Sequence, residues 1–161
     1  MSQAPYQLTP SEAAFIAGIL DTRGTIAVKN CRRARGFSLN LDFGSIPVVV
    51  TDWLHSRISQ SLLCSGKTYS YPYGTVRHPH YYLRVTDAVA IRMLGEQILP
   101  YLVARQQQWR AVLALAKLIA APRQAHTLTV TKLNLQRRFA AQIRAHQPIR
   151  PMTAKHLRVA S

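Results

Sequence analysis

Acidic residues are the scarcest class of charged side chain in this sequence. The chain of 161 residues has 6 Asp and Glu side chains against 21 Lys and Arg, which gives a formal net charge of +15. No acidic side chain follows Glu96. So large an excess of positive charge needs a polyanionic partner, because binding to phosphates releases their counterions. The composition therefore favours a nucleic acid, with an anionic membrane surface or an inert cationic face as weaker alternatives.

Cysteines are few, and the sequence lacks an export signal and a long apolar run. Cys31 and Cys64 are the two cysteines, and they are not spaced as a metal-binding pair. The first residues lack the basic-then-apolar pattern of an export signal. The most apolar stretch, residues 112–121, contains Lys117 and is far shorter than the roughly 20 residues of a membrane span. We therefore expect an intracellular protein of the cytoplasm or nucleoid, without a membrane partner.

The hydrophobic residues, 48% of the chain, suffice for one core, and their spacing predicts an α+β fold. Thr9, Pro10 and Glu12 form a helix start with a capping box, and Gly24 is the expected stop. The expected elements are helix 13–21, strands 25–29 and 37–43, helix 47–63, strands 68–73 and 81–85, and helices 87–94, 98–119 and 131–146. This order predicts four antiparallel strands with helices on one face.

The first helix and its exit, Ile16–Gly24, resemble the LAGLIDADG motif of homing endonucleases. The order of elements, the spacing of Phe43 and Trp53, and residues 99–108 are similar to the single-motif, homodimeric members of that family. The resemblance implies an αββαββα fold with a four-stranded antiparallel saddle sheet, plus C-terminal helices. It implies three regions: an N-terminal extension (1–8), a LAGLIDADG DNA-binding domain (9–121) and a basic C-terminal helix and tail (122–161).

Small side chains on the first helix predict a dimer interface. Ala14, Ala17 and Gly18 recur at helical spacing and would let two copies of the helix approach closely. Asp21 is interpreted as a helix-end or dimer-interface residue. In a two-fold dimer, the two half-sites on DNA must be roughly palindromic. The subunit core is expected to take the larger apolar residues of the helix, Phe15, Ile16, Ile19 and Leu20.

The sequence departs from the family pattern at the catalytic acid. In active members, the residue before the final glycine of the motif is an acid that binds divalent metals, and here it is Arg23. An arginine cannot ligate Mg²⁺ and repels it. Pro47 and Thr51 stand where homodimeric members carry polar and basic residues, whereas Arg105 keeps the place of a basic residue near the phosphate. We therefore predict DNA binding without a metal or cofactor, with Arg23 contacting phosphates directly.

The two strands of the first hairpin are expected to present a polar face to base edges. Alternation groups Thr25, Ala27, Lys29, Cys31 and Arg33 on this face in the first strand, and Ser38, Asn40 and Asp42 in the second. Lysine and arginine suit guanine edges, and Asn40 suits adenine. Asp42 can accept from cytosine or orient a neighbouring arginine. An ordinary solvated sheet face is the alternative interpretation.

Further contacts with DNA are expected from the second hairpin, the loops and the last helix. His80, Tyr82 and Arg84 are assigned to the polar face of the second hairpin, whereas the face taken by the row Tyr69, Tyr71 and Tyr73 stays open. The last helix is expected to contact phosphates. The full set of predicted DNA-binding residues is Arg23, Thr25, Lys29, Arg32, Arg33, Arg35, Ser38, Asn40, Asp42, Tyr71, Arg77, His80, Tyr82, Arg84, Arg105, Arg137 and Arg138.

Three functions compete for this sequence. The leading hypothesis is a homodimeric, catalytically inactive DNA-binding protein that acts as a transcriptional regulator at a pseudo-palindromic site. The second is a Mg²⁺-dependent homing endonuclease that still cuts, using Asp21 or an unrecognised acid, although Asp21 lies about 200° around the helix from Arg23. The third is an intron maturase that binds structured RNA, but a varied polar ribbon suits the major groove of DNA better than the narrow groove of A-form RNA.

Overall fold

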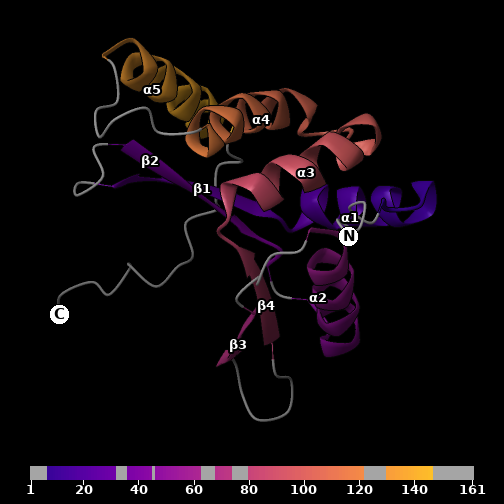
Figure 1. Cartoon of the computed structure of the whole chain (residues 1–161). Helices are drawn as coiled ribbons and strands as arrows, with labels where there is room; N and C mark the ends of the chain where they lie inside the picture. The colour runs from indigo at the N-terminus through magenta and orange to yellow at the C-terminus, as the bar shows by residue number, and fades with distance from the viewer. Residues whose placement is uncertain are drawn as a thin grey trace, which may run out of the picture.

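Five α-helices and four β-strands form the described part of the chain, which in this computed structural model comprises residues 7–31, 36–44, 46–62, 68–73, 80–121 and 130–146 (Figure 1). The elements are α1 (Pro10–Thr22), β1 (Thr25–Cys31), β2 (Gly36–Asp42), α2 (Val48–Leu62), β3 (Thr68–Tyr73), β4 (His80–Val85), α3 (Ala88–Ile98), the 3-10 helix η1 (Leu99–Tyr101), α4 (Gln106–Ala120) and α5 (Val130–Ala145). The predicted α+β fold is confirmed. No helix within these ranges combines the length and apolarity that crossing a membrane requires.

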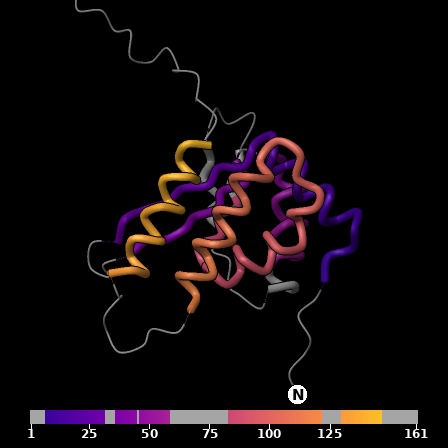
Figure 2. The backbone as a smooth tube through the Cα atoms, turned by 90° about the horizontal axis from the view of Figure 1, so that it is seen from above, coloured from indigo at the N-terminus to yellow at the C-terminus, as the bar shows by residue number. Residues whose placement is uncertain are grey.

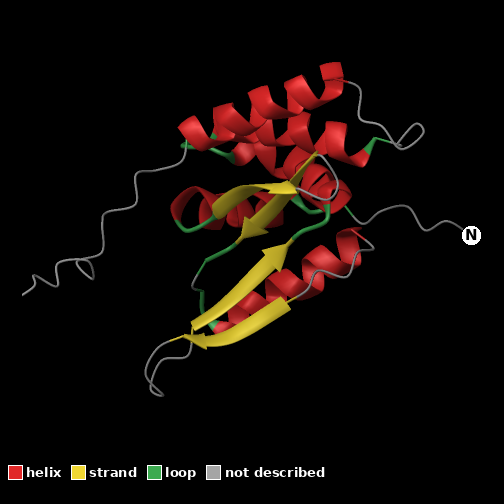
Figure 3. Ribbon diagram, turned by 90° about the vertical axis from the view of Figure 1, so that its left-hand side faces the viewer, coloured by secondary structure: helices red, strands yellow, loops and turns green. Residues whose placement is uncertain are grey.

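The four strands form one antiparallel sheet in the order β1-β2-β4-β3. β1 pairs with β2 along its whole length, with Thr25 opposite Asp42. β2 then pairs with β4 only through its last two residues, which places Asp42 opposite Arg84. Figure 3 shows the two hairpins meeting at this short contact, with α2 running beside the second hairpin. Asp42 therefore lies at the junction of the two hairpins.

One face of the sheet is apolar and covered by helices. The buried strand residues on this face are Ile26, Val28, Leu39, Leu41, Leu83 and Val85. α2 packs on β4, α3 and α4 pack on β2, and α5 contacts both β1 and β2. Figure 2 shows α5 lying beside α4, and Ala140 and Ile143 of α5 join the same core as Trp109 of α4. Because helices cover this face, the polar face of β1 and β2 is the one left for a ligand.

The start and end of α1 follow the predicted signals. Thr9 and Glu12 form the capping box, in which the Thr9 N–H donates to Glu12 Oε2 at 2.9 Å and the Glu12 N–H donates to Thr9 Oγ1 at 3.3 Å. Glu12 also forms an ion pair with Arg57 of α2 at 3.0 Å. At the other end, a Cβ on Gly24 would lie 2.7 Å from the Leu20 carbonyl oxygen, so the chain requires glycine there.

The helix predicted over residues 98–119 is wrong in its first turns. α3 continues to Ile98, the 3-10 helix follows, and α4 begins only at Gln106. Pro100 lies in the 3-10 turn, and the N–H groups of residues 103–105 are bound by the side chain of Asp21. The helix predicted over residues 87–94 is longer at its end, and its cap is Asp87, whose side chain accepts the Ala90 N–H at 2.8 Å.

Candidate nucleic-acid interface

Arg23 lies at the end of α1, with an exposed side chain. Its N–H donates to the Ile19 carbonyl at 2.8 Å. Its carbonyl oxygen packs against Gly44, which has a φ of 73° and whose Cβ, if present, would lie 2.6 Å from that oxygen. Glycine at position 44 therefore brings the turn after β2 against the end of α1. The backbone of Arg23 is fixed from two sides, while its side chain lies at the surface.

Asp21 has a structural task in its own subunit. Its Oδ2 accepts from the N–H groups of Val103 at 2.7 Å and Ala104 at 3.1 Å, and its Oδ1 accepts from the Arg105 N–H at 3.1 Å. These amides directly precede α4, where the helix dipole favours a negative charge. The Asp21 carboxylate is therefore bound within its own chain, at the N-terminus of α4.

Arg105 is partly buried beneath the end of α1. Its Nη1 donates to the Gly24 carbonyl oxygen. Burial lowers the pKa of Arg105, and the neighbouring Asp21 carboxylate opposes this shift. An arginine remains charged at neutral pH even so. The charged guanidinium therefore lies next to the end of α1, and the family resemblance predicts a basic residue near the phosphate at this position. One of its N–H donors already binds the Gly24 carbonyl oxygen.

All six acidic side chains of the chain lie in described segments, and most have structural partners. Asp21 and Asp87 bind backbone amides at helix starts, and Glu12 does so at α1. Asp42 pairs with Arg84, and Glu96 lies 3.5 Å from Lys117. Asp52 is exposed on α2. No acid is therefore left at the end of α1 to take the place that Arg23 occupies.

The residues at the end of α1 do not fit the divalent-metal site that the LAGLIDADG resemblance implies. Arg23 stands in the position of the acid, and the Asp21 carboxylate is bound to three backbone amides. Thr51 is 2% exposed and donates its hydroxyl to the Pro47 carbonyl at 3.2 Å, so it cannot order a water molecule at the surface. Within the described ranges, no three His, Cys, Asp or Glu side chains gather in a way that would hold a metal ion.

The predicted alternation is present over residues 25–29 of β1, but not in β2, where residues 39–41 are all buried. Ile26 and Val28 are buried, whereas Lys29 is exposed and Thr25 and Ser38 are partly exposed. Asn40 differs from the prediction, because only 8% of it is exposed. With its amide oxygen toward Lys29, it accepts from Nζ at 3.2 Å and donates to the Leu39 carbonyl at 3.0 Å. Asn40 is therefore a covered neighbour of Lys29 and is unsuited to read adenine directly.

Asp42 and Arg84 form a two-point ion pair across β2 and β4. Arg84 Nε donates to Oδ1 at 2.5 Å, and Nη2 donates to Oδ2 at 3.1 Å. The Arg84 side chain is 40% exposed and that of Asp42 is 18% exposed. Of the two roles predicted for Asp42, the structure shows the orientation of an arginine.

Several predicted contacts fall on residues or side chains outside the described part of the chain. Arg32, Arg33, Arg35 and Arg77 lie outside the described residues, as do the side chains of Tyr71, His80 and Tyr82 and of the tyrosine row on β3. On α5, Arg137 and Arg138 are exposed, as predicted for phosphate contacts. Arg144 donates from Nη2 to the Val28 carbonyl at 3.2 Å, which ties α5 to β1.

The outward face of α1 differs from the predicted one at two residues. Ala17 is 0% exposed, so it packs in its own subunit and is unavailable to a second copy. Phe15 was predicted in the core but is 50% exposed, with its ring edge-to-face against Trp53 at a centroid distance of 5.3 Å. The exposed residues, which we term the α1 stripe, are Ser11, Ala14, Phe15, Gly18 and Thr22.

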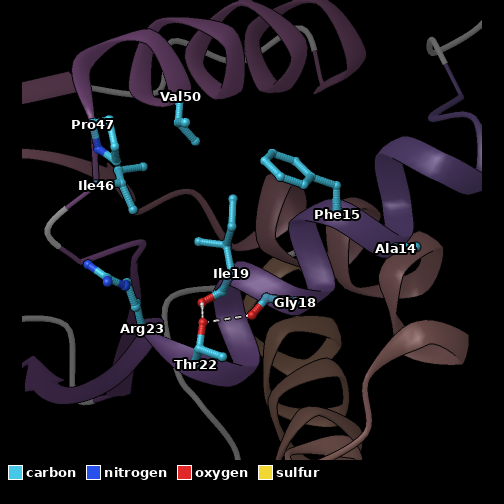
Figure 4. A pocket seen from close by; sticks show the side chains of 9 residues that line it. All are labelled: Ala14, Phe15, Gly18, Ile19, Thr22, Arg23, Ile46, Pro47 and Val50. Carbon is cyan, nitrogen blue, oxygen red and sulfur yellow. Dashed lines mark hydrogen bonds between the residues drawn. The ribbon is translucent and has the colours of Figure 1, made fainter.

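A groove of about 570 Å³ runs beside the α1 stripe, between α1 and the start of α2 (Figure 4). Phe15 and Ile19 point into it from α1 and Val50 from α2, and Arg23 lies at the end near Ile46. The Thr22 hydroxyl donates to the Gly18 carbonyl at 2.8 Å, so the stripe presents a largely apolar surface. Sequence periodicity did not predict that Phe15 is exposed. Phe15 and Ile19 are apolar and four residues apart, which is the spacing of a buried helix face as well as of an exposed one.

No model of a protein family matches this sequence, and no curated protein does. Solved structures do share its fold. The homing endonuclease I-CvuI, solved in complex with its target, has 18% sequence identity and a TM-score of 0.64, with 89% of this chain and 86% of that chain covered. The archaeal intron-encoded homing endonuclease I-Vdi141I, complexed with DNA, has 10% identity and a TM-score of 0.67, with 86% of each chain covered. The chain thus has the fold of LAGLIDADG homing endonucleases.

Proposed function

We propose that this protein is a homodimer that binds a pseudo-palindromic site in double-stranded DNA without cutting it, and that it acts as a transcriptional regulator by occupying that site. The fold and the charge of +15 support DNA as the ligand, since structures of similar fold were solved with DNA. RNA is the alternative polyanion, and binding to a random RNA pool distinguishes it from DNA.

The proposed absence of cleavage rests on the residue types and hydrogen bonds at the end of α1. Arg23 stands where the family resemblance places a metal-binding acid, and the Asp21 carboxylate accepts three backbone N–H groups of residues 103–105. Moving Asp21 onto a metal would leave those amides unpaired at the start of α4. A divalent metal would therefore lack a carboxylate ligand at position 23, and metal-dependent hydrolysis would not proceed. Arg23 is instead suited to bind a phosphate directly.

The α1 stripe supports the homodimer. Apart from the adjacent backbone of α1, a Cβ on Gly18 would meet no atom of the described residues within 4 Å, so these residues do not require glycine there. Glycine in a helix interior costs about 1 kcal/mol relative to alanine. A close approach by the same helix of a second copy gives this glycine a physical reason. It also brings the two Arg23 side chains toward the two-fold axis.

Selection from random duplexes in the absence of divalent metal tests the proposal. We expect enrichment of a palindromic consensus of about 20 base pairs, two half-sites one helical turn apart. The same selection on a random RNA pool should enrich no sequence. Enrichment of RNA alone would contradict the proposal and would favour the maturase hypothesis.

A further inference from the structure

Arg105 joins the start of α4 to the end of α1 through both its backbone and its side chain. Its N–H donates to Asp21 Oδ1 at 3.1 Å, and its Nη1 donates to the Gly24 carbonyl oxygen. The same Asp21 carboxylate accepts the N–H groups of Val103 and Ala104 through Oδ2. Two segments that lie more than 80 residues apart in the sequence are therefore linked in both directions.

Neither of these charged residues is favoured by the helix to which it belongs. Asp21 lies in the last turn of α1, where the helix dipole disfavours a negative charge, and Arg105 is the N-cap of α4, where the dipole disfavours a positive charge. The Arg105 side chain makes no capping hydrogen bond in α4. Each side chain instead reaches the end of the other helix, where its charge is favourable. The contact between α1 and α4, and not local helix formation, therefore explains both residue types.

This contact holds the backbone of Gly24, where α1 passes into β1. The Gly24 N–H donates to the Ile19 and Leu20 carbonyl oxygens, each at 3.2 Å, and the Gly24 carbonyl oxygen accepts from Arg105. Thr25, the next residue, is the first of β1. Because α1 binds the N–H of Gly24 and Arg105 binds its carbonyl oxygen, the direction in which β1 leaves α1 is fixed.

The junction at Gly24 lies between the two surfaces on which the proposed function depends. The α1 stripe is the proposed dimer face, and the polar face of β1 and β2 is the proposed DNA face. β1 has seven residues, so its far end lies about 20 Å from the junction. A rotation of about 10° at the junction would move that end by about 3.5 Å, close to the rise of about 3.4 Å per base pair. The angle at Gly24 therefore determines how far apart two sheets reach along DNA.

We propose that Arg105 is a positioning residue that fixes the angle between the α1 helices of the dimer and each sheet, and thereby sets the spacing of the two half-sites. It acts within its own subunit, through the Gly24 carbonyl oxygen, and is not itself a phosphate contact. This inference rests on the proposed binding of DNA by a homodimer. It gives Arg105 a role different from the phosphate contact that the family resemblance predicts.

The test uses the duplex selected by the wild-type protein and two derivatives, which have one base pair inserted or deleted between the half-sites. One base pair changes the separation of the half-sites by about 3.4 Å and their relative rotation by about 35°. We expect wild-type binding to fall about a hundredfold on each derivative, and binding by Arg105→Gln to fall only about tenfold. An equal loss in the two proteins would overturn the proposal, as would wild-type binding that does not depend on spacing.

Arg105→Lys separates positioning from direct contact with phosphate. Lysine keeps the positive charge but lacks the planar guanidinium that donates to the Gly24 carbonyl oxygen. We expect Arg105→Lys to lose spacing discrimination as Arg105→Gln does, and both variants to keep the wild-type slope of log K against log salt concentration. If Arg105→Gln lowered that slope by about two while Arg105→Lys kept it, Arg105 would be a phosphate contact and the proposal would be overturned.

Two control variants account for charge and for stability. Arg110→Gln removes an exposed arginine of α4 and should keep the wild-type dependence on spacing. Asp87→Ala removes the side chain that caps α3, so it should lower the melting temperature without changing that dependence. If Asp87→Ala relaxes the spacing as much as Arg105→Gln, the effect is one of stability and the positioning role is overturned. If the wild-type protein enriches no duplex at all, the proposed function itself fails, and this inference fails with it.

Discussion

Arg23 and Asp21 are two residues apart in the sequence but have separate tasks. The Asp21 carboxylate closes the start of α4, whereas Arg23 carries positive charge to the exposed end of α1. The residue type at position 23 could be read from the sequence, because an arginine in the place of an acid is a visible departure from a motif. The partners of Asp21 could not, since they lie more than 80 residues downstream and no local pattern indicates them.

Substituting Arg23 tests its contact with phosphate. Arg23→Ala in a dimer removes one such contact per subunit. We expect the slope of log K against log salt concentration to fall by about two, because each phosphate contact contributes about 0.9. Arg110→Ala, which removes an exposed arginine of α4, is the matched control and should leave the slope unchanged. An unchanged slope for Arg23→Ala would show that Arg23 does not bind phosphate.

Substituting Asp21 tests its structural task. Asp21→Asn keeps the shape but removes the charge that accepts three N–H groups, so we expect the free energy of unfolding to fall by about 1–3 kcal/mol. Urea denaturation measures this change. Asp52→Asn, on the exposed surface of α2, makes the same change of charge and should alter stability by less than about 0.5 kcal/mol. Equal effects of the two substitutions would contradict the anchoring of α4 by Asp21.

At the scale of elements, local signals predicted most of the fold. Alternation defined both strands of the first hairpin, and Thr9 and Glu12 defined the start of α1. The errors arose where a distant contact overrides a local pattern. Residues 102–105 are apolar or good helix formers, yet the Asp21 side chain takes the amides that a continuous helix would use. Phe15 and Ala17 lie on the opposite faces from those predicted, because apolar and small residues occur on both faces of α1 and their types alone do not show which face is buried.

The outward face of α1 gives a prediction at this scale. Gly18→Leu adds a side chain where the subunit has open space, so the isolated fold should persist. The added volume should prevent the close approach of two α1 helices, and we expect the protein to become a monomer in sedimentation equilibrium. Ala141→Leu, which adds a similar volume at an exposed position of α5, should leave the dimer intact. A Gly18→Leu protein that still dimerises would place the interface elsewhere.

At the scale of the whole molecule, the few acidic side chains and the many basic side chains have different roles. Acids cap helices, join α1 to α2 and orient Arg84, while exposed arginines lie at the end of α1 and on α5. The net charge could be read from the composition, but the use of each acid could not. The partners that define those uses come from different elements. The fold shared with homing endonucleases therefore carries, at the end of α1, an exposed arginine and a carboxylate bound to backbone amides.

The most direct test of the central claim is cleavage of the selected duplex. The purified protein is incubated with this duplex in the presence of Mg²⁺ or Mn²⁺, and binding and strand integrity are measured in the same samples. We expect equal affinity with and without metal, and intact DNA in every sample. Double-strand breaks within the bound site that require the metal would contradict the claim that this protein occupies DNA without cutting it.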